Sequence, residues 1–219
     1  MTRLAVFDCD GTLVDSQANI CRAMESCFAA HRMEPPDRAA IRGIVGLSLV
    51  PAIARLLPDA DAALHAAMAE EYKRAFFAMR SNNALDPEPL FDGVAAAIDA
   101  LEGAGWLLGV ATGKSDRGLA AVLEHHGIRH RFVTLQTADR HPSKPHPSML
   151  EAAIAEAGSA ADRCAMIGDT SFDMAMARAA GAHAIGVAWG YHSPGELADA
   201  GAHRVAAHAD QLAAMLEDL

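Results

Sequence analysis

The segment LAVFDCDGTLVDS, at positions 4–16, places two acidic residues directly behind a short apolar run. Positions 4–7 are continuously apolar, which is typical of a strand buried on both faces of a parallel sheet. Beyond them Asp8 and Asp10 alternate along an extended chain, so their side chains point to the same side while Cys9 faces the core. The segment therefore predicts a buried strand that presents two carboxylates at its end.

The rest of the chain repeats this pairing of a short apolar run with a helix. Four further runs have the length of a buried strand: 106–111, 132–136, 164–167 and 184–189. Helical patterns of ten or more residues separate the later runs: 116–126, 147–157 and 171–180. A weaker strand is expected near 203–206, before a last helix at 210–217. Strands that alternate with helices predict an α/β fold, a Rossmann-like parallel sheet with helices on both faces.

One long interval carries almost no strand signal and is predicted to be helical. Between the first two strands, Pro and Gly separate four helical stretches: 16–31, 37–41, 48–57 and 60–79. A Pro-containing linker at 82–93 then leads to a helix at 94–102 that belongs to the core. With 219 residues the chain suits a core domain that carries a smaller insertion. We expect an α/β core domain at 1–15 and 84–219, and an all-helical cap domain at 16–83.

Composition and charge exclude several classes of partner. The chain carries 18 Lys and Arg against 28 Asp and Glu, a formal net charge of −10, and its cations are scattered. A nucleic-acid surface needs clustered positive charge, so no nucleic acid is expected. The first apolar run is too short for a signal peptide, and no run approaches the ~18 apolar residues of a membrane helix. We expect a cytoplasmic protein without membrane contact, and nothing in the sequence specifies its oligomeric state.

Chemically active side chains follow the predicted strands where those strands end. Thr112 and Gly113 come after the second run, and Asp169 follows the fourth. Lys144 belongs to the loop after the third run. Because ligands bind beyond the carboxyl ends of the strands in an open parallel sheet, we expect these groups to meet Asp8 there.

Phosphoryl transfer suits this set of groups. Two carboxylates so close together repel unless a cation lies between them, and with Asp169 the site offers only oxygen, which fits octahedral Mg²⁺. A carboxylate screened by Mg²⁺ can attack phosphorus and form an aspartyl phosphate. The Thr112 hydroxyl and the Gly113 N–H can meet the phosphoryl oxygens, and Lys144 supplies a point charge. The expected partner is a small phosphorylated metabolite.

Five motifs, spread over essentially the whole chain, carry a family resemblance: VFDCDGTLVDS, ATGKS, SKPHP, MIGDTSFDMAMARAAG and GVAWGY. With them the chain resembles the haloacid dehalogenase superfamily, and within it the phosphoglycolate phosphatase-like branch with a helical cap after the first strand. The resemblance implies that Asp8 is the nucleophile and Asp10 the general acid, later the base that activates water. It also implies that Asp8, the carbonyl of Asp10, and Asp169 ligate Mg²⁺, with Asp173 beside them or as a further ligand.

The stretch GVATGKS, at 109–115, is close to a nucleotide-binding loop but lacks its spacing. A P-loop has four residues between its first glycine and Gly-Lys-Ser, whereas three separate the two glycines here. The resemblance assigns the transferring phosphoryl group instead to Thr112 and Lys144. Lys114 is then expected at the rim of the cleft, where it helps to hold the leaving group.

Two positions keep a structural alternative beside the functional one. Asp173 could instead cap the helix around it, since an acid is favourable in a first helical turn. In the cap, IRGIVGLSL at 41–49 is the candidate loop that reaches the substrate: glycines such as Gly46 allow a tight turn, and Arg42 could pair with a carboxylate. The alternative is a plain connection between helices, with Arg42 in solvent.

The function that fits best is hydrolysis of small phosphomonoesters, with phosphoglycolate as the first candidate by resemblance. A phosphomutase of the β-phosphoglucomutase type shares the nucleophile, but such enzymes usually carry a branched apolar residue where Thr12 stands. Dehalogenases and phosphonate hydrolases fit poorly, because they lack the acid that is present here as Asp10. A catalytically silent interaction protein is the remaining alternative, and the complete set of catalytic positions weakens it.

Overall fold

A six-stranded parallel sheet forms the centre of the computed structural model, which describes residues 2–217. Its strands are β1 (Thr2–Phe7), β2 (Trp106–Thr112), β3 (Phe132–Thr137), β4 (Ser159–Gly168), β5 (His183–Val187) and β6 (Arg204–Ala206). Their order is β3-β2-β1-β4-β5-β6, so the chain builds outward from β1 to one edge and then returns to build the other side. The α/β Rossmann-like prediction is confirmed. The strand order reverses between β1 and β4, where ligands bind in such sheets.

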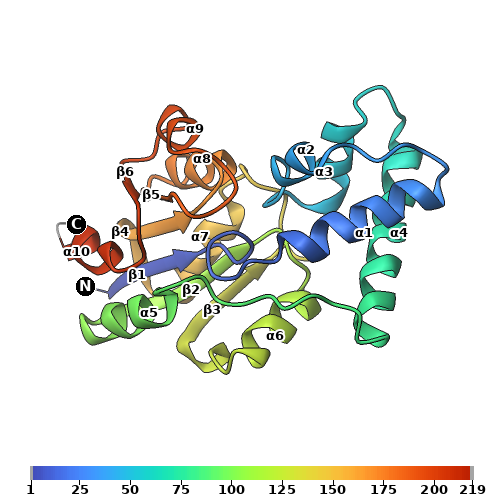
Figure 1. The fold of residues 1–219 in the computed structure, drawn as a ribbon. Coiled ribbons are helices and arrows are strands. Elements are labelled where there is room, and N and C mark those ends of the chain that lie inside the picture. Colours follow the sequence, from blue (N-terminus) through green and yellow to red (C-terminus); the bar gives the residue numbers. More distant parts are fainter. Residues whose placement is uncertain (1, 218–219) are drawn as a thin grey trace.

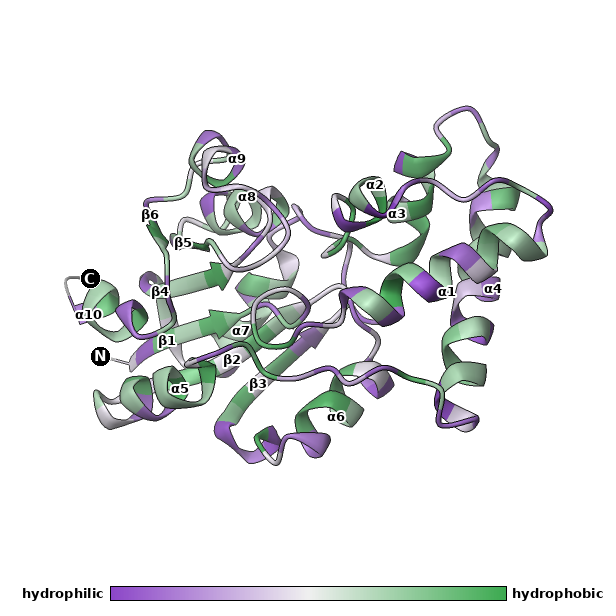
Figure 2. Cartoon of the chain, viewed as in Figure 1, coloured by the Kyte–Doolittle hydropathy of each residue, from purple (hydrophilic) through white to green (hydrophobic). Residues whose placement is uncertain are grey.

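Helices cover both faces of the sheet (Figure 1). One face packs against α5 (Val94–Gly103), α6 (Asp116–His125) and α10 (Gln211–Glu217); the other packs against α7 (Ser148–Glu156), α8 (Ser171–Ala179) and α9 (Pro194–Asp199). Strand β1 shows the alternation directly: Ala5 and Phe7 enter the first core, and Leu4 and Val6 enter the second. Because both faces are buried, the central strand β1 and the second half of β4 are largely apolar (Figure 2).

Four helices lie between β1 and α5 and stand beside the sheet rather than on it (Figure 1). They are α1 (Gln17–Ala30), α2 (Arg38–Arg42), α3 (Leu49–Leu56) and α4 (Ala62–Ser81). They bury an apolar cluster of their own around Met24, Phe28, Ile53 and Met68, and Phe172 of α8 joins that cluster. We propose on this basis that 16–83 form a cap domain, and that 1–15 with 84–219 form the core.

The two chain segments that join cap and core are tied together. The Asn19 side chain is fully buried; its amide donates to the Asp86 carbonyl at 2.9 Å and its oxygen accepts from the Asp86 N–H at 2.8 Å. Arg22 adds an ion pair to the Asp86 carboxylate at 2.8 Å. The outgoing helix α1 therefore holds the returning linker, which fixes where the cap leaves the core.

Two short elements and one strand extension were not predicted. Helix α9 begins with a capping box between Ser193 and Glu196 and has Pro194 at its first position, so its start was readable in the sequence. A 3₁₀ turn covers Arg129–Arg131, and β4 begins at Ser159, ahead of its apolar part. Among residues 2–217, no helix combines the length and the apolar character needed to cross a membrane.

Candidate active site

Three carboxylates converge at the carboxyl ends of the two central strands. Asp8 follows β1, Asp169 follows β4, and Asp173 lies in the first turn of α8. One oxygen of each lies within 4.8 Å of the others, and all three side chains are fully buried. The reversal of strand order places them there, because β1 and β4 are neighbours although far apart in the sequence.

Glycines leave the room for this cluster. A Cβ on Gly11 would lie 2.2 Å from Oδ2 of Asp169, and a Cβ on Gly190 would lie 2.2 Å from the Asp169 Cβ. Gly11 also has a φ of +85°, a conformation that L side chains rarely adopt. Any side chain at position 11 or position 190 would therefore overlap Asp169, so both positions require glycine.

Lys144 enters the cluster from the loop between β3 and α7. Its Nζ lies 2.6 Å from Oδ1 of Asp173 and 2.9 Å from Oδ1 of Asp8, and its side chain is fully buried. Burial alone would lower the pKa of Lys144, but the Asp173 and Asp8 carboxylates outweigh it and hold the pKa above its usual value. The lysine is therefore a fixed positive charge beside the predicted nucleophile.

The electrostatics of the cluster fit a divalent cation. Three carboxylates face one lysine, and Oδ2 of Asp8 has no hydrogen-bond partner among the described residues. Burial raises the pKa of Asp8 to about 7, with the charges of Asp173 and Asp10 adding to the rise and Lys144 opposing it. Burial and the neighbouring Asp8 and Asp173 likewise raise the pKa of Asp169 well above its usual value. A hard cation with oxygen ligands relieves this repulsion.

Asp173 both caps its helix and faces the cluster. Its Oδ2 accepts from the Thr170 N–H at 3.1 Å and from the Thr170 hydroxyl at 2.7 Å, while its Oδ1 accepts from Lys144. Thr170 is the N-cap, and the two residues form a capping box. The structural and the functional alternative for Asp173 are therefore compatible, since they use different oxygens.

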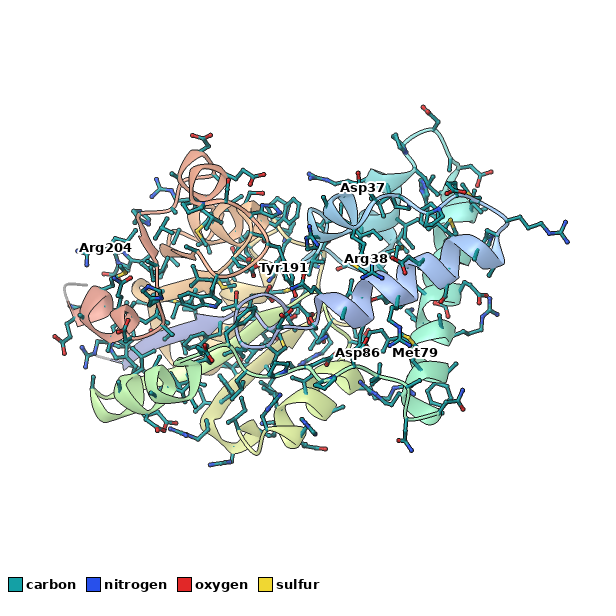
Figure 3. All side chains as sticks on the ribbon, in the orientation of Figure 1. Asp37, Arg38, Met79, Asp86, Tyr191 and Arg204 are labelled. Carbon is teal, nitrogen blue, oxygen red and sulfur yellow. The ribbon has the colours of Figure 1, made fainter. Side chains whose placement is uncertain are left out.

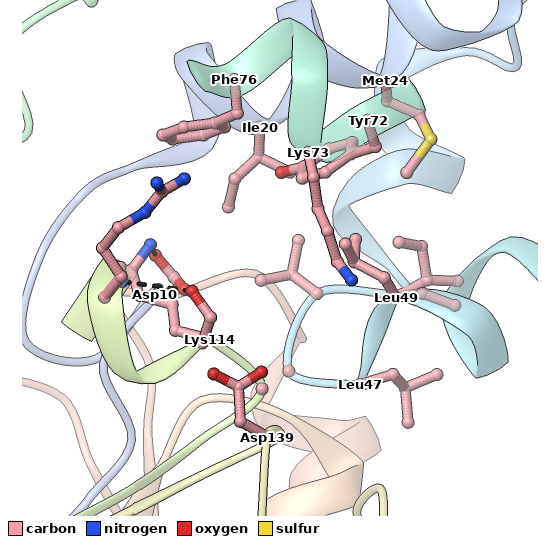
Figure 4. Close-up of a pocket in the computed structure, with 18 of the residues that line it drawn as sticks. Asp10, Ile20, Met24, Leu47, Leu49, Tyr72, Lys73, Phe76, Lys114 and Asp139 are labelled. Carbon is pink, nitrogen blue, oxygen red and sulfur yellow. Dashed lines mark hydrogen bonds and ion pairs between the residues drawn. The ribbon is translucent and has the colours of Figure 1, made fainter. Parts of the chain in front are cut away.

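Asp10 lies outside the group of three carboxylates and lines a cavity. Lys114 lies 2.7 Å from its Oδ1 (Figure 4). The Ser16 hydroxyl donates to the same oxygen. Ser16 occupies the N-cap position of α1 but makes no capping hydrogen bond with its side chain. The sequence indicates only a helix start at Ser16, and no local signal marks its contact with Asp10.

The cap loop reaches the predicted phosphate-binding residues. Thr112 is buried at the end of β2, and a Cβ on Gly113 would lie 2.7 Å from the Gly46 carbonyl oxygen and 2.6 Å from that of Leu47. Gly46 itself has a φ of +96°. The structure thus brings Gly46 to the sheet edge. Arg42 does not line the cavity beside Asp10.

That cavity has a volume of about 380 Å³ and lies between cap and core (Figure 4). Asp10, Gly113 and Lys114 form its floor on the core side. Tyr191 lies at the junction of cap and core and packs against the apolar cluster of the cap (Figure 3). The geometry therefore joins a buried acidic cluster, one buried lysine and a covered cavity at a single sheet edge.

The family model for haloacid dehalogenase-like hydrolases matches residues 5–187, which include all four acids and both lysines of the site. The chain belongs to this hydrolase family. The family match confirms the resemblance found in the sequence motifs. The matched residues include the proposed cap and most of the core.

Relatives and solved structures agree with this membership. The hydrolase is 38% identical over 201 residues to a probable phosphatase, IndB, of Dickeya dadantii, covering 90% of this chain and 86% of that protein. It is 30% identical over 190 residues to a phosphoglycolate phosphatase of Xanthomonas campestris, covering 86% and 84%.

Its fold matches a predicted phosphatase from Clostridium acetobutylicum with a TM-score of 0.89 at 24% identity, covering 100% of both chains. It also matches a β-phosphoglucomutase from Clostridium difficile with a TM-score of 0.78 at 19% identity, covering 97% of this chain and 93% of that one. At these identities the two likenesses establish the fold of the hydrolase and not its reaction.

Proposed function

We propose that this hydrolase is a Mg²⁺-dependent phosphatase that works through an aspartyl phosphate on Asp8. The enzyme class, a phosphoric monoester hydrolase, follows from the family together with relatives named as phosphatases. The observation that carries the mechanism is the buried Asp8 carboxylate, which has one free oxygen and lies 2.9 Å from Lys144.

Asp8, the carbonyl of Asp10, and Asp169 would hold the cation, with Asp173 beside them. A bound Mg²⁺ supplies charge neutralisation for the phosphoryl oxygens and for the crowded carboxylates. Lys144 supplies a further fixed positive charge, and Thr112 and Gly113 supply donors from the end of β2. These groups are held by buried contacts before substrate arrives, which is what electrostatic stabilisation of a transition state needs.

Two displacements complete the reaction. An oxygen of Asp8 attacks phosphorus, the bond from phosphorus to the ester oxygen breaks, and Asp10 donates a proton to the leaving alkoxide. Asp10 then takes a proton from water, whose oxygen attacks the phosphoenzyme and releases phosphate and the Asp8 carboxylate. Asp10 suits both roles because it lies outside the acidic cluster, at the floor of the cavity where the leaving group would sit.

Phosphoglycolate is the first substrate to test, because a relative at 30% identity is named as a phosphoglycolate phosphatase.

The phosphomutase alternative stays weaker. Thr12 donates its hydroxyl to Oδ1 of Asp169 at 2.8 Å, a contact that a branched apolar residue could not make. The silent interaction protein is disfavoured by the complete site. The cytoplasmic location stays a prediction from the N-terminal sequence.

Phosphate release from a panel of phosphomonoesters, with Mg²⁺ and with a chelator, tests the proposal. We expect Mg²⁺-dependent turnover that falls to background in Asp8→Asn, a variant that keeps the shape of the side chain and removes its charge. Circular dichroism should show an unchanged fold. Substantial Mg²⁺-dependent hydrolysis by a correctly folded Asp8→Asn protein would contradict the aspartyl-phosphate mechanism.

A further inference from the structure

The cavity beside Asp10 has the chemistry of a binding site for a large leaving group. We propose that the hydrolase selects phosphomonoesters whose leaving group carries an aromatic or broad apolar body and, beyond it, a second anionic group. This inference rests on the proposed phosphatase function. It goes further by assigning the substrate class from the walls of the cavity.

The cavity is continuous with the reaction centre. Asp10, Gly113 and Lys114 line its floor, so an alkoxide that receives a proton from Asp10 leaves into this space. Its volume of about 380 Å³ falls within the range of pockets that enclose drug-sized ligands, roughly 300–1,000 Å³. The two-carbon leaving group of phosphoglycolate would leave most of it unfilled.

The walls of the cavity are apolar and partly aromatic. Helix α4 contributes Tyr72 and Phe76, which share one side of that helix because they are four positions apart, and the more exposed Phe77. Ile20 and Met24 of α1 lie nearby (Figure 4). The cap loop adds further apolar side chains, so a small hydrophilic ligand would cover little of this surface. A flat apolar body would replace water along it, and burial of apolar area favours binding.

Two cations that line the cavity have no acidic partner among the described residues. Arg80 of α4 and Arg117 of α6 have no carboxylate partner among residues 2–217, and they lie over the rings of Phe76 and Phe77 at 5.8 and 5.1 Å. Lys73 also lines the cavity, but it pairs with Glu70 at 2.7 Å.

The whole lining holds four cations against two acids, Asp10 and Asp139, in a chain with a net charge of −10. A local excess of cations in an acidic protein marks a place for an anion. Arg80 and Arg117 line the cavity, whereas the buried Lys144 that serves the phosphoryl group does not. The second anionic group of the substrate therefore pairs with these two guanidinium groups.

Three primary alkyl phosphates separate binding from chemical reactivity: propyl phosphate, 3-phenylpropyl phosphate and 3-(4-carboxyphenyl)propyl phosphate. Their leaving alkoxides have similar basicity, so differences in kcat/KM measure how well the cavity binds the leaving group. We expect kcat/KM to rise at least about tenfold when the phenyl ring is added, and severalfold more when the carboxylate is added.

Variants test the two parts of the inference separately. Phe76→Ala should lower the phenylpropyl-to-propyl ratio of kcat/KM by about tenfold. Arg80→Gln and Arg117→Gln should lower only the further gain from the carboxylate. Matched controls on the cap are Val50→Ala, an exposed apolar residue outside the cavity, and Arg74→Gln, which pairs with Glu71. Both controls should leave these ratios unchanged.

The outcome that overturns the inference is a kcat/KM for 3-phenylpropyl phosphate no higher than that for propyl phosphate, or a higher value for phosphoglycolate than for either. Calorimetry with butylphosphonate and 4-phenylbutylphosphonate, which cannot be hydrolysed, keeps the inference separate from the proposed reaction. Tighter binding of the phenyl compound without any turnover of the esters would support the cavity assignment and overturn the phosphatase. Equal binding of the two phosphonates would overturn the cavity assignment.

Discussion

Replacement of Lys144 by Met removes the charge at the centre of the buried cluster and keeps most of the side-chain volume. The lysine Nζ lies 2.6 Å from Asp173 and 2.9 Å from Asp8, and all three side chains are fully buried. Breaking a buried ion pair by removing one partner typically costs about 3–5 kcal/mol, because the remaining charge is left uncompensated. For a domain with an unfolding free energy of ~5–15 kcal/mol, Lys144→Met should be folded but clearly weakened.

The loss of unfolding free energy in Lys144→Met should depend on pH, and the pKa of Asp8 determines the direction. In the metal-free parent that pKa is raised to about 7, whereas an unfolded Asp ionises near pH 4. The contribution of Asp8 to the stability of the parent therefore falls as pH rises from ~4 to ~7 and then levels off. Without the Lys144 charge the folded pKa lies higher still, so the variant goes on losing stability above pH 7. The difference in unfolding free energy should widen above pH 7 by about 1.4 kcal/mol per pH unit for each proton retained.

Urea denaturation with a chelator at pH 6, 7 and 8 measures this difference, and kinetics with Mg²⁺ measures the catalytic loss. We expect kcat to fall by a factor on the order of 10²–10³ in Lys144→Met. Lys114→Met is the matched control, since Lys114 pairs with Asp10 in the cavity and should act mainly through KM. A stability difference that stays constant from pH 6 to 8, or an equal loss of kcat in the two variants, would refute the reasoning.

Three further changes test other parts of the site. Asp10→Asn should slow turnover by about 10²–10⁴-fold on alkyl phosphates and less on aryl phosphates, whose leaving groups need little protonation; equal losses on both would remove the general-acid role. Mg²⁺ should raise the melting temperature, more at pH 8 than at pH 5, because protons compete with the metal for carboxylates whose pKa values are raised. Asp169→Asn should abolish this increase in melting temperature. An increase that does not depend on pH would contradict the metal assignment. Gly113→Ala should lower the unfolding free energy by about 1–3 kcal/mol and lower kcat/KM, since its Cβ would meet the Gly46 and Leu47 carbonyl oxygens. Denaturation and kinetics identical to those of the parent would show that the cap loop moves to make room for the methyl group.

The sequence by itself determined the core and the acidic cluster. Apolar runs buried on both faces have a local signature, and in a parallel sheet the residue after each strand reaches the same edge whatever the loops do. That rule alone places Asp8 and Asp169 together, although 160 positions separate them. Asp173 lies four positions beyond Asp169, in the first turn of the helix that follows β4, so it reaches the same edge.

The tertiary structure alone decided what surrounds Asp10. Its contact with Ser16 depends on how α1 leaves the core, and Lys114 reaches it from the end of β2. Likewise the sequence offers Arg42 as the cap's substrate contact, whereas the residues that line the cavity include Arg80 and Arg117. Helical patterns show which residues are apolar but not which helix faces the core, since that depends on how the cap packs on the sheet edge. The proposed catalytic set therefore follows from local sequence patterns, while the proposed leaving-group cavity arises only from packing between segments distant in the chain.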